Sequence, residues 1–375
     1  MNLTINKLKS SPLFNLSLSS KELFHSNFLF WLGQNYPNEF GLLFRDYLTQ
    51  KPENSSITHI FREKENIDLS FVYSNNQEIL VENKVKSNPN LEQLKRYSEK
   101  NPNKNYLLLS LSEPLFFSSQ KTLRIGDATW HYLSYSELKD KLRIAIDRIE
   151  NSYHRQIEED YLLFIEGLVG VNSLCQVGGN DLFDFHSLDN NTFYNSLKDT
   201  RLHDFYQKKK YELLAFEVYR KLKESNNYIA KLVEFGEELN WESQTPLIYT
   251  GFGMARGVGL MDMKYLVAEN LTLGIQIQGE HYRMVVEDNN GQIAHRIKEE
   301  LDNDYWFDLS RSFPNEKVYP NITRGFNAFG KSFFYKSVKL GSNKSVNEVV
   351  EFILKDVELI NSNLTEIQRL VAQVM

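Results

Sequence analysis

Residues 67–84 read IDLSFVYSNNQEILVENK and predict a β-hairpin. Residues 67–73 and 78–85 have the composition of strands, and the polar cluster SNNQ between them has the composition of a turn. Because side chains alternate between the two faces of a strand, Glu82 and Lys84 share one face. A carboxylate and an ammonium group at the end of an apolar strand are costly to bury unless they are paired or used.

The length of the hairpin loop decides which face Asp68 occupies. With a two-residue turn, Asp68 lies opposite Asn83, and Glu82 lies on the other face. With a three-residue loop at 74–76, Asp68 lies opposite Glu82. Asparagine tolerates the left-handed backbone conformation that such a loop usually needs. We therefore predict the three-residue loop, or an equivalent bulge, and a shared face for Asp68 and Glu82.

The segments around the hairpin alternate between helical and strand patterns. Before it we expect a helix from Ser19 or Ser20 to Gly33, and a short helix at 41–49. After it we expect a helix at 91–99, strands at 106–111 and 129–133, and one long helix from a capping box at Ser134 and Glu137 to about residue 168. This order predicts an α/β core with a mixed sheet.

The second half of the chain has a different pattern. We expect a loop at 177–191, helix at 192–240, strands at 247–250, 263–267, 271–278 and 283–287, and a helix at 345–374. A length of 375 residues favours two domains. We predict one domain at 1–170, and an α+β domain at 171–375 that serves substrate recognition or assembly.

The net charge of −6, from 43 Lys plus Arg and 49 Asp plus Glu, argues against a protein that coats nucleic acid through bulk positive charge. Residues 81–104 nevertheless hold six basic and three acidic side chains, a local charge of +3 that suits a groove for a polyanion. The single cysteine, Cys175, excludes an intramolecular disulfide and fits a reducing compartment. We see no signal peptide and no apolar run long enough for a bilayer, so we expect a cytoplasmic protein without a membrane partner.

The charged residues of the hairpin suit phosphodiester hydrolysis. Asp68 and Glu82 are carboxylates of the kind that hold Mg²⁺, which polarises a phosphate and lowers the pKa of a bound water. Lys84 beside them can orient that water or stabilise negative charge on the phosphate. Gln93 and Tyr97, four residues apart, share one face of the next helix and can hydrogen-bond phosphate oxygens or bases.

This arrangement resembles the PD-(D/E)XK nuclease superfamily, and most closely a bacterial and phage-associated branch with E-N-K and Q-L-x-R-Y motifs. The resemblance rests on Asp68, on Glu82 and Lys84, and on Gln93 and Tyr97. It extends back to E-x-x-H-S at residues 22–26 and forward to W-x-x-L-S-Y at residues 130–135. The proline of the superfamily name is replaced by Ile67, at a position that varies among members.

The resemblance implies a restriction-endonuclease-like mixed sheet flanked by helices, and cleavage of DNA with Mg²⁺, for which Mn²⁺ can substitute. Asp68 and Glu82 are then metal ligands, Lys84 is the catalytic lysine, and Gln93 and Tyr97 support the site. Glu22 is an additional acidic group at the metal. The nucleic-acid-binding candidates in the basic segment are Lys86, Lys95 and Arg96. A homodimer and a role in phage defence or DNA repair are further expectations.

Other interpretations of the same residues stay open. Glu82 and Lys84 suit an exposed charge pair on an edge strand, and Glu22 suits a first-turn acid that the helix dipole favours. His25 suits packing or hydrogen bonding better than metal ligation. The run of lysines at 208–210 suits a solvated helix face, with a DNA-facing strip as the alternative.

Two functions of other classes compete with the nuclease. One is a non-catalytic nucleic-acid-binding or interaction protein that retains a nuclease-like core. The other is a nucleotide-dependent enzyme that acts through the glycines at 251–259. Because a strand rather than a helix is expected after these glycines, they fit a β turn better than a phosphate-binding loop.

Overall fold

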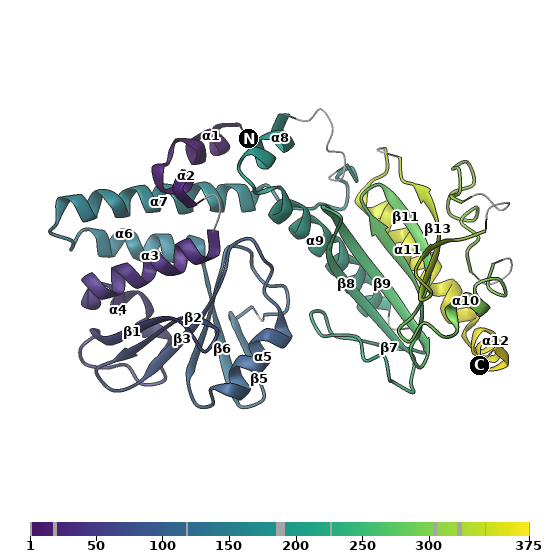
Figure 1. Ribbon diagram of the computed structural model, residues 1–375, viewed down its shortest axis with the longest axis horizontal. Coiled ribbons are helices and arrows are strands. Elements are labelled where there is room, and N and C mark those ends of the chain that lie inside the picture. The colour runs from purple at the N-terminus through teal and green to yellow at the C-terminus, as the bar shows by residue number, and fades with distance from the viewer. Residues whose placement is uncertain are drawn as a thin grey trace. The chain divides into compact units, whose positions relative to one another are not determined.

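The computed structural model describes residues 2–17, 21–117, 119–184, 192–225, 227–302, 306–320, 325–341 and 343–374. The chain forms two compact units (Figure 1). Unit 1 comprises Met1–Cys175 and Thr192–Tyr206, and unit 2 comprises Gln176–Asn191 and Gln207–Met375. Each unit has one mixed sheet with flanking helices, which confirms the predicted α/β class and is consistent with a restriction-endonuclease-like fold.

The sheet of unit 1 has six strands in the order β1-β2-β3-β4-β6-β5. They are β1 (Ile57–Lys64), β2 (Ile67–Tyr73), β3 (Glu78–Lys84), β4 (Asn105–Ser110), β5 (Thr122–Ile125) and β6 (Ala128–Ser134). The pairs β1/β2, β2/β3 and β5/β6 are antiparallel, whereas β3/β4 and β4/β6 are parallel. The prediction missed β1 and β5, because both are edge strands whose mostly exposed or half-buried residues give no strong apolar pattern.

The hairpin loop has the predicted length of three residues. The pairing of β2 with β3 runs from Leu69 opposite Val81 to Val72 opposite Glu78, and continuing this register by one residue sets Asp68 opposite Glu82. Within the loop, Asn76 has a φ of 62°, which is the left-handed conformation expected for an asparagine there. Asp68 and Glu82 therefore lie on one face of the sheet.

The helices of unit 1 are α1 (Asn2–Ser10), α2 (Pro12–Ser17), α3 (Lys21–Asn35), α4 (Pro37–Phe44), the 3₁₀ turn η1 (Arg45–Tyr47), α5 (Leu91–Lys100), α6 (Tyr135–Ile146), α7 (Ser152–Ser173) and α8 (Thr192–Asp199). The predicted caps Ser19 and Ser20 lie outside the described residues. The capping box at Ser134 and Glu137 is confirmed. The single long helix was wrong, because the side chain of Asn151 accepts hydrogen bonds from the first amides of α7 and starts a new helix that packs on α6.

The two faces of the sheet are covered by different helices. On one face, Phe71 of β2 contacts the ring of Phe40 on α4, and the Tyr73 hydroxyl donates to the carbonyl of Gly41. On the other face, Leu94 of α5 is buried against Leu80 and the neighbouring strands β4 and β6. Asp68 and Glu82 share this second face with Leu80, so α5 stands beside the two carboxylates.

Unit 2 contains a seven-stranded sheet in the order β12-β13-β11-β10-β9-β8-β7. The strands are β7 (Lys231–Leu232), β8 (Leu247–Ala255), β9 (Val258–Ala268), β10 (Leu271–Gln278), β11 (His281–Asp288), β12 (Asn327–Phe329) and β13 (Phe333–Lys339). Its helices are α9 (His203–Ser225), which begins in unit 1, α10 (Ala294–Ile297), α11 (Val346–Ser362) and α12 (Leu364–Val374). The four predicted strands are confirmed. The predicted C-terminal helix is interrupted at Asn363, and the helix expected to reach residue 240 ends at Ser225.

Two further sequence features have a plain structural role in unit 2. The glycines at 251–259 lie in the β8–β9 hairpin, whose turn residues Arg256 and Gly257 have positive φ, so a strand does follow them. The lysine run does not form a solvated face. Lys209 is buried and pairs with Glu212 at 2.9 Å, and Lys210 is buried and donates to the carbonyl of Gln176.

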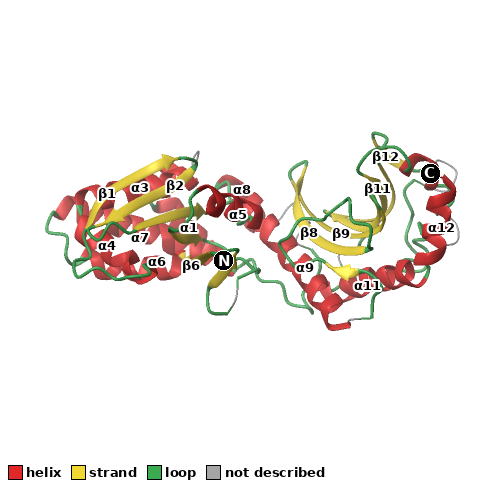
Figure 2. Ribbon diagram, turned by 90° about the horizontal axis from the view of Figure 1, so that it is seen from below, coloured by secondary structure: helices red, strands yellow, loops and turns green. Residues whose placement is uncertain are grey.

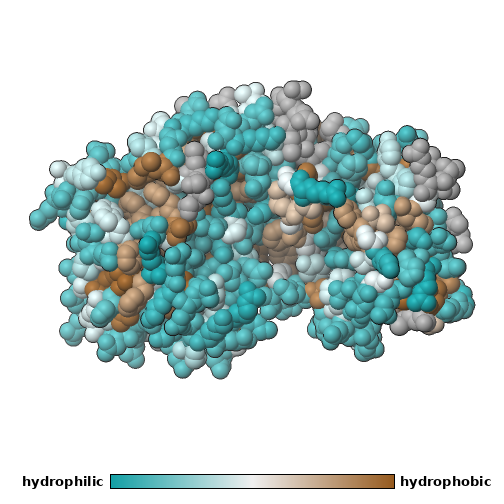
Figure 3. All heavy atoms as spheres, in the orientation of Figure 1, coloured by the Kyte–Doolittle hydropathy of each residue, from teal (hydrophilic) through white to brown (hydrophobic). Residues whose placement is uncertain are grey.

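Hydrophilic side chains dominate the face of the molecule seen in Figure 3, and apolar side chains appear there in separate patches. Within the described ranges, the helices are all too short or too polar to cross a bilayer.

Glu158 on α7 is a buried acid in unit 1 that is expected to make stability depend on pH. It is 1% exposed, neither carboxylate oxygen has a hydrogen-bond partner among the described residues, and burial, with the nearby charge of Glu39, raises its pKa to about 8. Since the unfolded chain releases this proton near its ordinary pKa, stability is expected to fall as pH rises between about 4.5 and 8.

The Glu158→Gln substitution is expected to raise the free energy of unfolding by about 2–4 kcal/mol at alkaline pH, and by little at acidic pH. Thermal unfolding at both ends of this range measures the difference. Glu159→Gln, at an exposed position on the same helix, is the control. An equal gain for Glu158→Gln at both pH values would contradict a buried protonated carboxyl.

Candidate active site

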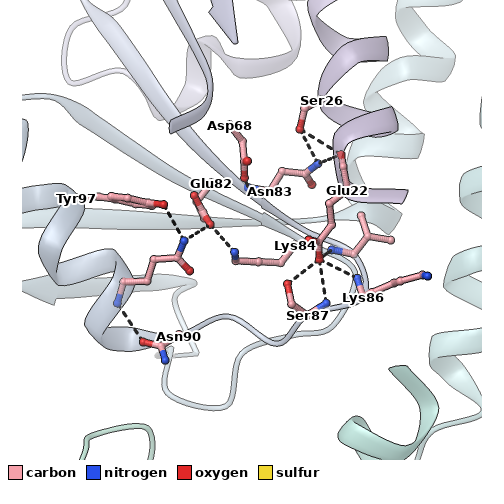
Figure 4. A network of polar contacts seen from close by, with 12 residues as sticks. Glu22, Ser26, Asp68, Glu82, Asn83, Lys84, Lys86, Ser87, Asn90 and Tyr97 are labelled. Carbon is pink, nitrogen blue, oxygen red and sulfur yellow. Dashed lines mark hydrogen bonds and ion pairs between the residues drawn. The ribbon is translucent and has the colours of Figure 1, made fainter. Parts of the chain in front are cut away.

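Three charged side chains meet at the open end of the β2–β3 hairpin, away from its loop, on the face beside α5. Asp68 comes from β2, and Glu82 and Lys84 come from β3 (Figure 4). Ile79, Leu80 and Val81 of β3 are apolar and buried, so the strand carries Glu82 into the protein rather than to its surface. The predicted alternative, an exposed charge pair on an edge strand, does not hold, because β3 is an inner strand and Glu82 is 1% exposed.

Glu82 has one oxygen with partners and one without. Its Oε1 accepts hydrogen bonds from Lys84 Nζ at 2.5 Å and from Gln93 Nε2 at 2.8 Å. Its Oε2 is buried and has no hydrogen-bond partner among the described residues. Burial, together with the neighbouring charge of Asp68, raises the pKa of Glu82 to about 7. The carboxylate form of Glu82 therefore lacks part of the positive charge or donors that would stabilise it.

Asp68 lies next to Glu82 and is tied to the backbone of β3. Its Oδ2 accepts a hydrogen bond from the amide of Asn83 at 2.7 Å. Burial raises the pKa of Asp68, although this hydrogen bond and the charge of Lys84 act in the opposite direction. This hydrogen bond from the Asn83 amide fixes the carboxylate of Asp68 beside that of Glu82.

The two carboxylates fit a hard divalent cation that keeps several waters. Mg²⁺ is commonly bound through one or two protein carboxylates plus substrate phosphates, with water completing its coordination. The free Oε2 of Glu82 and the adjacent Asp68 supply such a set. In the part of the chain that the structure describes, no three His, Cys, Asp or Glu side chains gather as a complete metal cage. The donor set therefore fits an open site better than an all-protein one.

Lys84 stays charged in this environment. Burial alone lowers the pKa of its ammonium group, but the carboxylates of Glu82, Glu22 and Asp68 outweigh that effect and the pKa is raised. Its side chain is 13% exposed, and its Nζ lies at the Glu82 carboxylate. A positive charge at this position can hold a water or a phosphate oxygen next to the carboxylates.

Gln93 and Tyr97 share one face of α5, as their spacing predicted, and on that face Gln93 contacts Glu82. The side chain of Asn90 accepts a hydrogen bond from the amide of Gln93 and caps the helix, which places Gln93 in its first turn. Gln93 Nε2 donates both to Glu82 Oε1 and to the Tyr97 hydroxyl, the latter at 2.7 Å. Burial raises the pKa of the Tyr97 phenol, which therefore stays protonated. The pair orients Glu82.

Glu22 of α3 is placed at the turn after β3. Its Oε1 accepts hydrogen bonds from the amides of Val85, Lys86 and Ser87, and from the Ser87 hydroxyl at 2.6 Å. Burial raises the pKa of Glu22, but the hydrogen bonds from Ser87 outweigh it and the pKa is lowered. The structure thus gives Glu22 a role in fixing the turn that follows Lys84. The charge of Glu22 also acts on Asp68, Glu82 and Lys84, and raises the pKa of each of the three groups.

Asn83 is a structural anchor of the site that the sequence reasoning did not single out. Its side chain points to the opposite face of β3 from Glu82 and Lys84 (Figure 4). There its Nδ2 donates to the carbonyl of Glu22 and to Ser26 Oγ, and its Oδ1 accepts from the Tyr135 hydroxyl at 2.7 Å. The available signal was a polar residue inside an otherwise buried strand. Asn83 ties β3 to α3 and α6.

His25 packs behind Asn83 and serves the core, as predicted. It is fully buried, its Nδ1 lies 2.9 Å from the Tyr161 hydroxyl, and its ring packs edge-on against Tyr135.

The three predicted nucleic-acid-binding residues lie in different surroundings. The Lys86 side chain points away from Glu82 (Figure 4). Arg96 is exposed on α5, one position before Tyr97, and so flanks the helix face that carries Gln93. Lys95 is exposed on the far side of α5, where it lines a separate cavity of about 600 Å³ with Ser98. Of the three, Arg96 is the one next to Gln93 and Tyr97 by its position on the helix.

Comparison with known proteins relates the first part of the chain to a nuclease superfamily. Residues 13–163 match the sequence profile of the PD-(D/E)XK nuclease superfamily, so unit 1 contains a nuclease-like domain, as the motifs indicated. Members of this superfamily are generally nucleases that use divalent metals. Searches of the curated proteins and of the solved structures give no significant match.

Proposed function

We propose that the protein is a divalent-metal-dependent nuclease that hydrolyses phosphodiester bonds in DNA, with its site at Asp68, Glu82 and Lys84. The observation that carries the proposal is the buried Oε2 of Glu82, which has no protein partner among the described residues and stands next to a second carboxylate. A buried carboxylate oxygen without a donor is unfavourable unless something positive binds it.

Asp68 and Glu82 would hold the metal, which we take to be Mg²⁺, with Mn²⁺ as a substitute. When bound, such an ion polarises the phosphate and makes water a better nucleophile. Lys84 donates a hydrogen bond to Glu82 Oε1, and its ammonium group has further protons to donate. In this proposal Lys84 orients the attacking water and stabilises charge that develops on the phosphate oxygens.

The remaining residues position these three groups. Gln93 holds Glu82 Oε1, so that Oε2 stays turned toward the metal position, and Tyr97 holds Gln93. Glu22 fixes the turn after Lys84 through three backbone amides. We infer that Glu22 acts through this turn rather than as a metal ligand. Arg96 stands at the edge of the site, where a phosphate of the DNA backbone would pass.

Residues 1–170 are proposed as the nuclease domain, and residues 171–375 as a region that recognises the substrate. A cytoplasmic location, a homodimer and a role in phage defence remain proposals that rest on the sequence alone. The alternative is a non-catalytic module that keeps a nuclease-like core. The intact set of two carboxylates and a lysine favours the enzyme, because binding alone requires none of the three.

The Lys84→Ala protein separates these two functions. Cleavage of single-stranded, double-stranded and modified DNA is measured with Mg²⁺ or Mn²⁺, and metal binding is measured by calorimetry. We expect wild-type protein to cut at least one substrate, and Lys84→Ala to bind the metal while losing about a hundredfold or more in rate. Lys100→Ala, which removes an exposed lysine at the end of α5, is the control. Absence of both cleavage and metal binding in the wild type would overturn the proposal.

A further inference from the structure

The sheet of unit 2 has one covered and one open face. On β9, Met261, Met263 and Tyr265 are fully buried on the side of α9 and α11, where the Tyr265 hydroxyl donates to Asn361. The alternate residues Asp262 and Lys264 are only half-buried. Figure 2 shows this sheet curved like a trough, with α9 and α11 along its outer side. The half-buried residues therefore line the inner, concave face.

A row of polar side chains crosses the middle of the concave face. Asp262 of β9, Gln276 of β10 and Arg283 of β11 lie directly opposite one another. Gln276 Nε2 donates to Asp262 Oδ1 at 3.0 Å, and Arg283 Nη1 donates to Gln276 Oε1 at 2.6 Å. These contacts hold the three side chains flat along the floor of the trough and fix the direction of the Arg283 guanidinium.

Arg283 has more donors than the protein uses. Its Nε is buried and has no hydrogen-bond partner among the described residues. Its Cζ lies 4.7 Å from the centre of the Tyr335 ring, on the adjacent strand β13. Burial, and the charge of Arg256, lower the pKa of the guanidinium, which is the direction expected for a cation short of acceptors. A guanidinium fixed on an aromatic ring with free N–H groups is suited to bind an oxyanion.

Aromatic rings and glycines, which have no side chain, give the concave face its shape. Lys264 crosses over Gly274 to reach Glu287 at 2.8 Å, and its Nζ lies 5.1 Å from the centre of the Trp241 ring. On β8, the Tyr249 hydroxyl lies 2.4 Å from where a Cβ of Gly251 would stand, so the Tyr249 ring lies across the glycine. The concave face is therefore shallowly filled at the glycines, and aromatic rings lie on both sides of the row formed by Asp262, Gln276 and Arg283.

We propose that this concave face binds an unpaired nucleotide of single-stranded nucleic acid. Arg283 donates to a phosphate oxygen, and the Tyr249 or Tyr335 ring stacks on a base. Asp262 and Gln276 lie between them, where they accept and donate hydrogen bonds at a base edge. The proposal rests on the proposed nuclease function, because it assigns substrate recognition to unit 2.

The chemistry of the face favours a nucleotide over the other classes of ligand. Its centre carries Asp262, Lys264, Gln276 and Arg283 beside the apolar Val285, so it is more polar than the core of a protein–protein interface. The two acids of the face are engaged, Asp262 by Gln276 and Glu287 by Lys264, which leaves no set of carboxylates for a metal. Single-stranded nucleic acid is bound by aromatic rings that stack on its bases and by guanidinium groups that donate to its phosphates, and this face offers both.

Binding of a fluorescent single-stranded DNA oligonucleotide to the full chain tests this in the presence of EDTA, which prevents cleavage. Fluorescence anisotropy compares the wild type with Arg283→Gln and Tyr335→Leu, each checked for an unchanged unfolding temperature. Arg220→Gln is the matched control, because Arg220 lies on α9, away from the concave face, and pairs with Glu217. We expect Arg283→Gln and Tyr335→Leu each to weaken binding about tenfold or more, and Arg220→Gln to change it less than about twofold.

Two results would overturn the proposal. One is binding by both concave-face variants with the affinity of the wild type. The other is binding of a free nucleoside monophosphate with the same dependence on Arg283 but no binding of the oligonucleotide, which would assign the face to a free nucleotide. Because the assay contains no metal, its outcome is independent of cleavage. Loss of cleavage in Lys84→Ala with normal oligonucleotide binding would show that the nuclease site and the concave face are tested separately.

Discussion

Replacing Glu82 by glutamine is expected to lower the rate of metal-dependent DNA cleavage by about a thousandfold or more. The substitution keeps the size of the side chain, and its carbonyl oxygen can still accept from Lys84 or Gln93. It removes the negative charge of Glu82, whose buried Oε2 has no protein partner among the described residues. Without that charge, Asp68 alone remains to hold the cation, so metal affinity and rate are expected to fall together.

The unfolding temperature, measured with and without metal, separates a metal ligand from a structural acid at this position. Mg²⁺ or Mn²⁺ raises the unfolding temperature of the wild type, because the metal binds to the native state alone. We expect Glu82→Gln to abolish this rise and the cleavage together, while its metal-free unfolding temperature stays near or above that of the wild type, because a buried charge has been removed.

Glu78→Gln is the matched control for this experiment. Glu78 is at the other end of β3 on the same face as Glu82, where it pairs with Lys104. The control is expected to keep both the metal-dependent rise and the cleavage. If Glu82→Gln retained a wild-type response to metal, Asp68 and Glu82 would not be the metal ligands.

The part of the site that follows from local rules was predictable. Strand alternation and the preference of asparagine for the left-handed region led to the loop at 74–76, and through it to a shared face for Asp68 and Glu82. The four-residue spacing of Gln93 and Tyr97 likewise placed both side chains on one face of the helix, where they contact each other. In each case the relevant residues lie within one hairpin or one helix turn.

The features that depend on long-range packing were not predictable. The hydrogen-bond partners of Glu22 are the amides after β3, more than sixty residues away in the chain, which no local pattern indicates. The lysines at 209 and 210 were expected to be solvated, although Glu212 and the carbonyl of Gln176 make their burial possible. The edge strands β1 and β5 gain their hydrogen bonds from neighbours and carry little apolar pattern of their own.

Asn83 is the clearest case in which function depends on a residue that faces away from the chemistry. It stands between Glu82 and Lys84 in the strand, so both charged side chains leave the backbone at positions that Asn83 fixes. Its amide group makes three side-chain hydrogen bonds, to the Glu22 carbonyl, to Ser26 and to Tyr135. Since these partners come from α3 and α6, Asn83 sets the distance between the hairpin and the helical layer.

The Asn83→Leu substitution is therefore expected to lower the free energy of unfolding of unit 1 by about 3 kcal/mol or more, because it leaves buried partners without hydrogen bonds. Adding Tyr135→Phe removes the stranded hydroxyl and is expected to recover about 1–2 kcal/mol in the double mutant. Tyr132→Phe, which alters another buried tyrosine that does not contact Asn83, should give no recovery. Thermal or denaturant unfolding of the four variants measures the coupling. Equal effects of Tyr135→Phe in the wild-type and Asn83→Leu backgrounds would show that the two side chains do not act together, and that β3 is held in place by its strand neighbours alone.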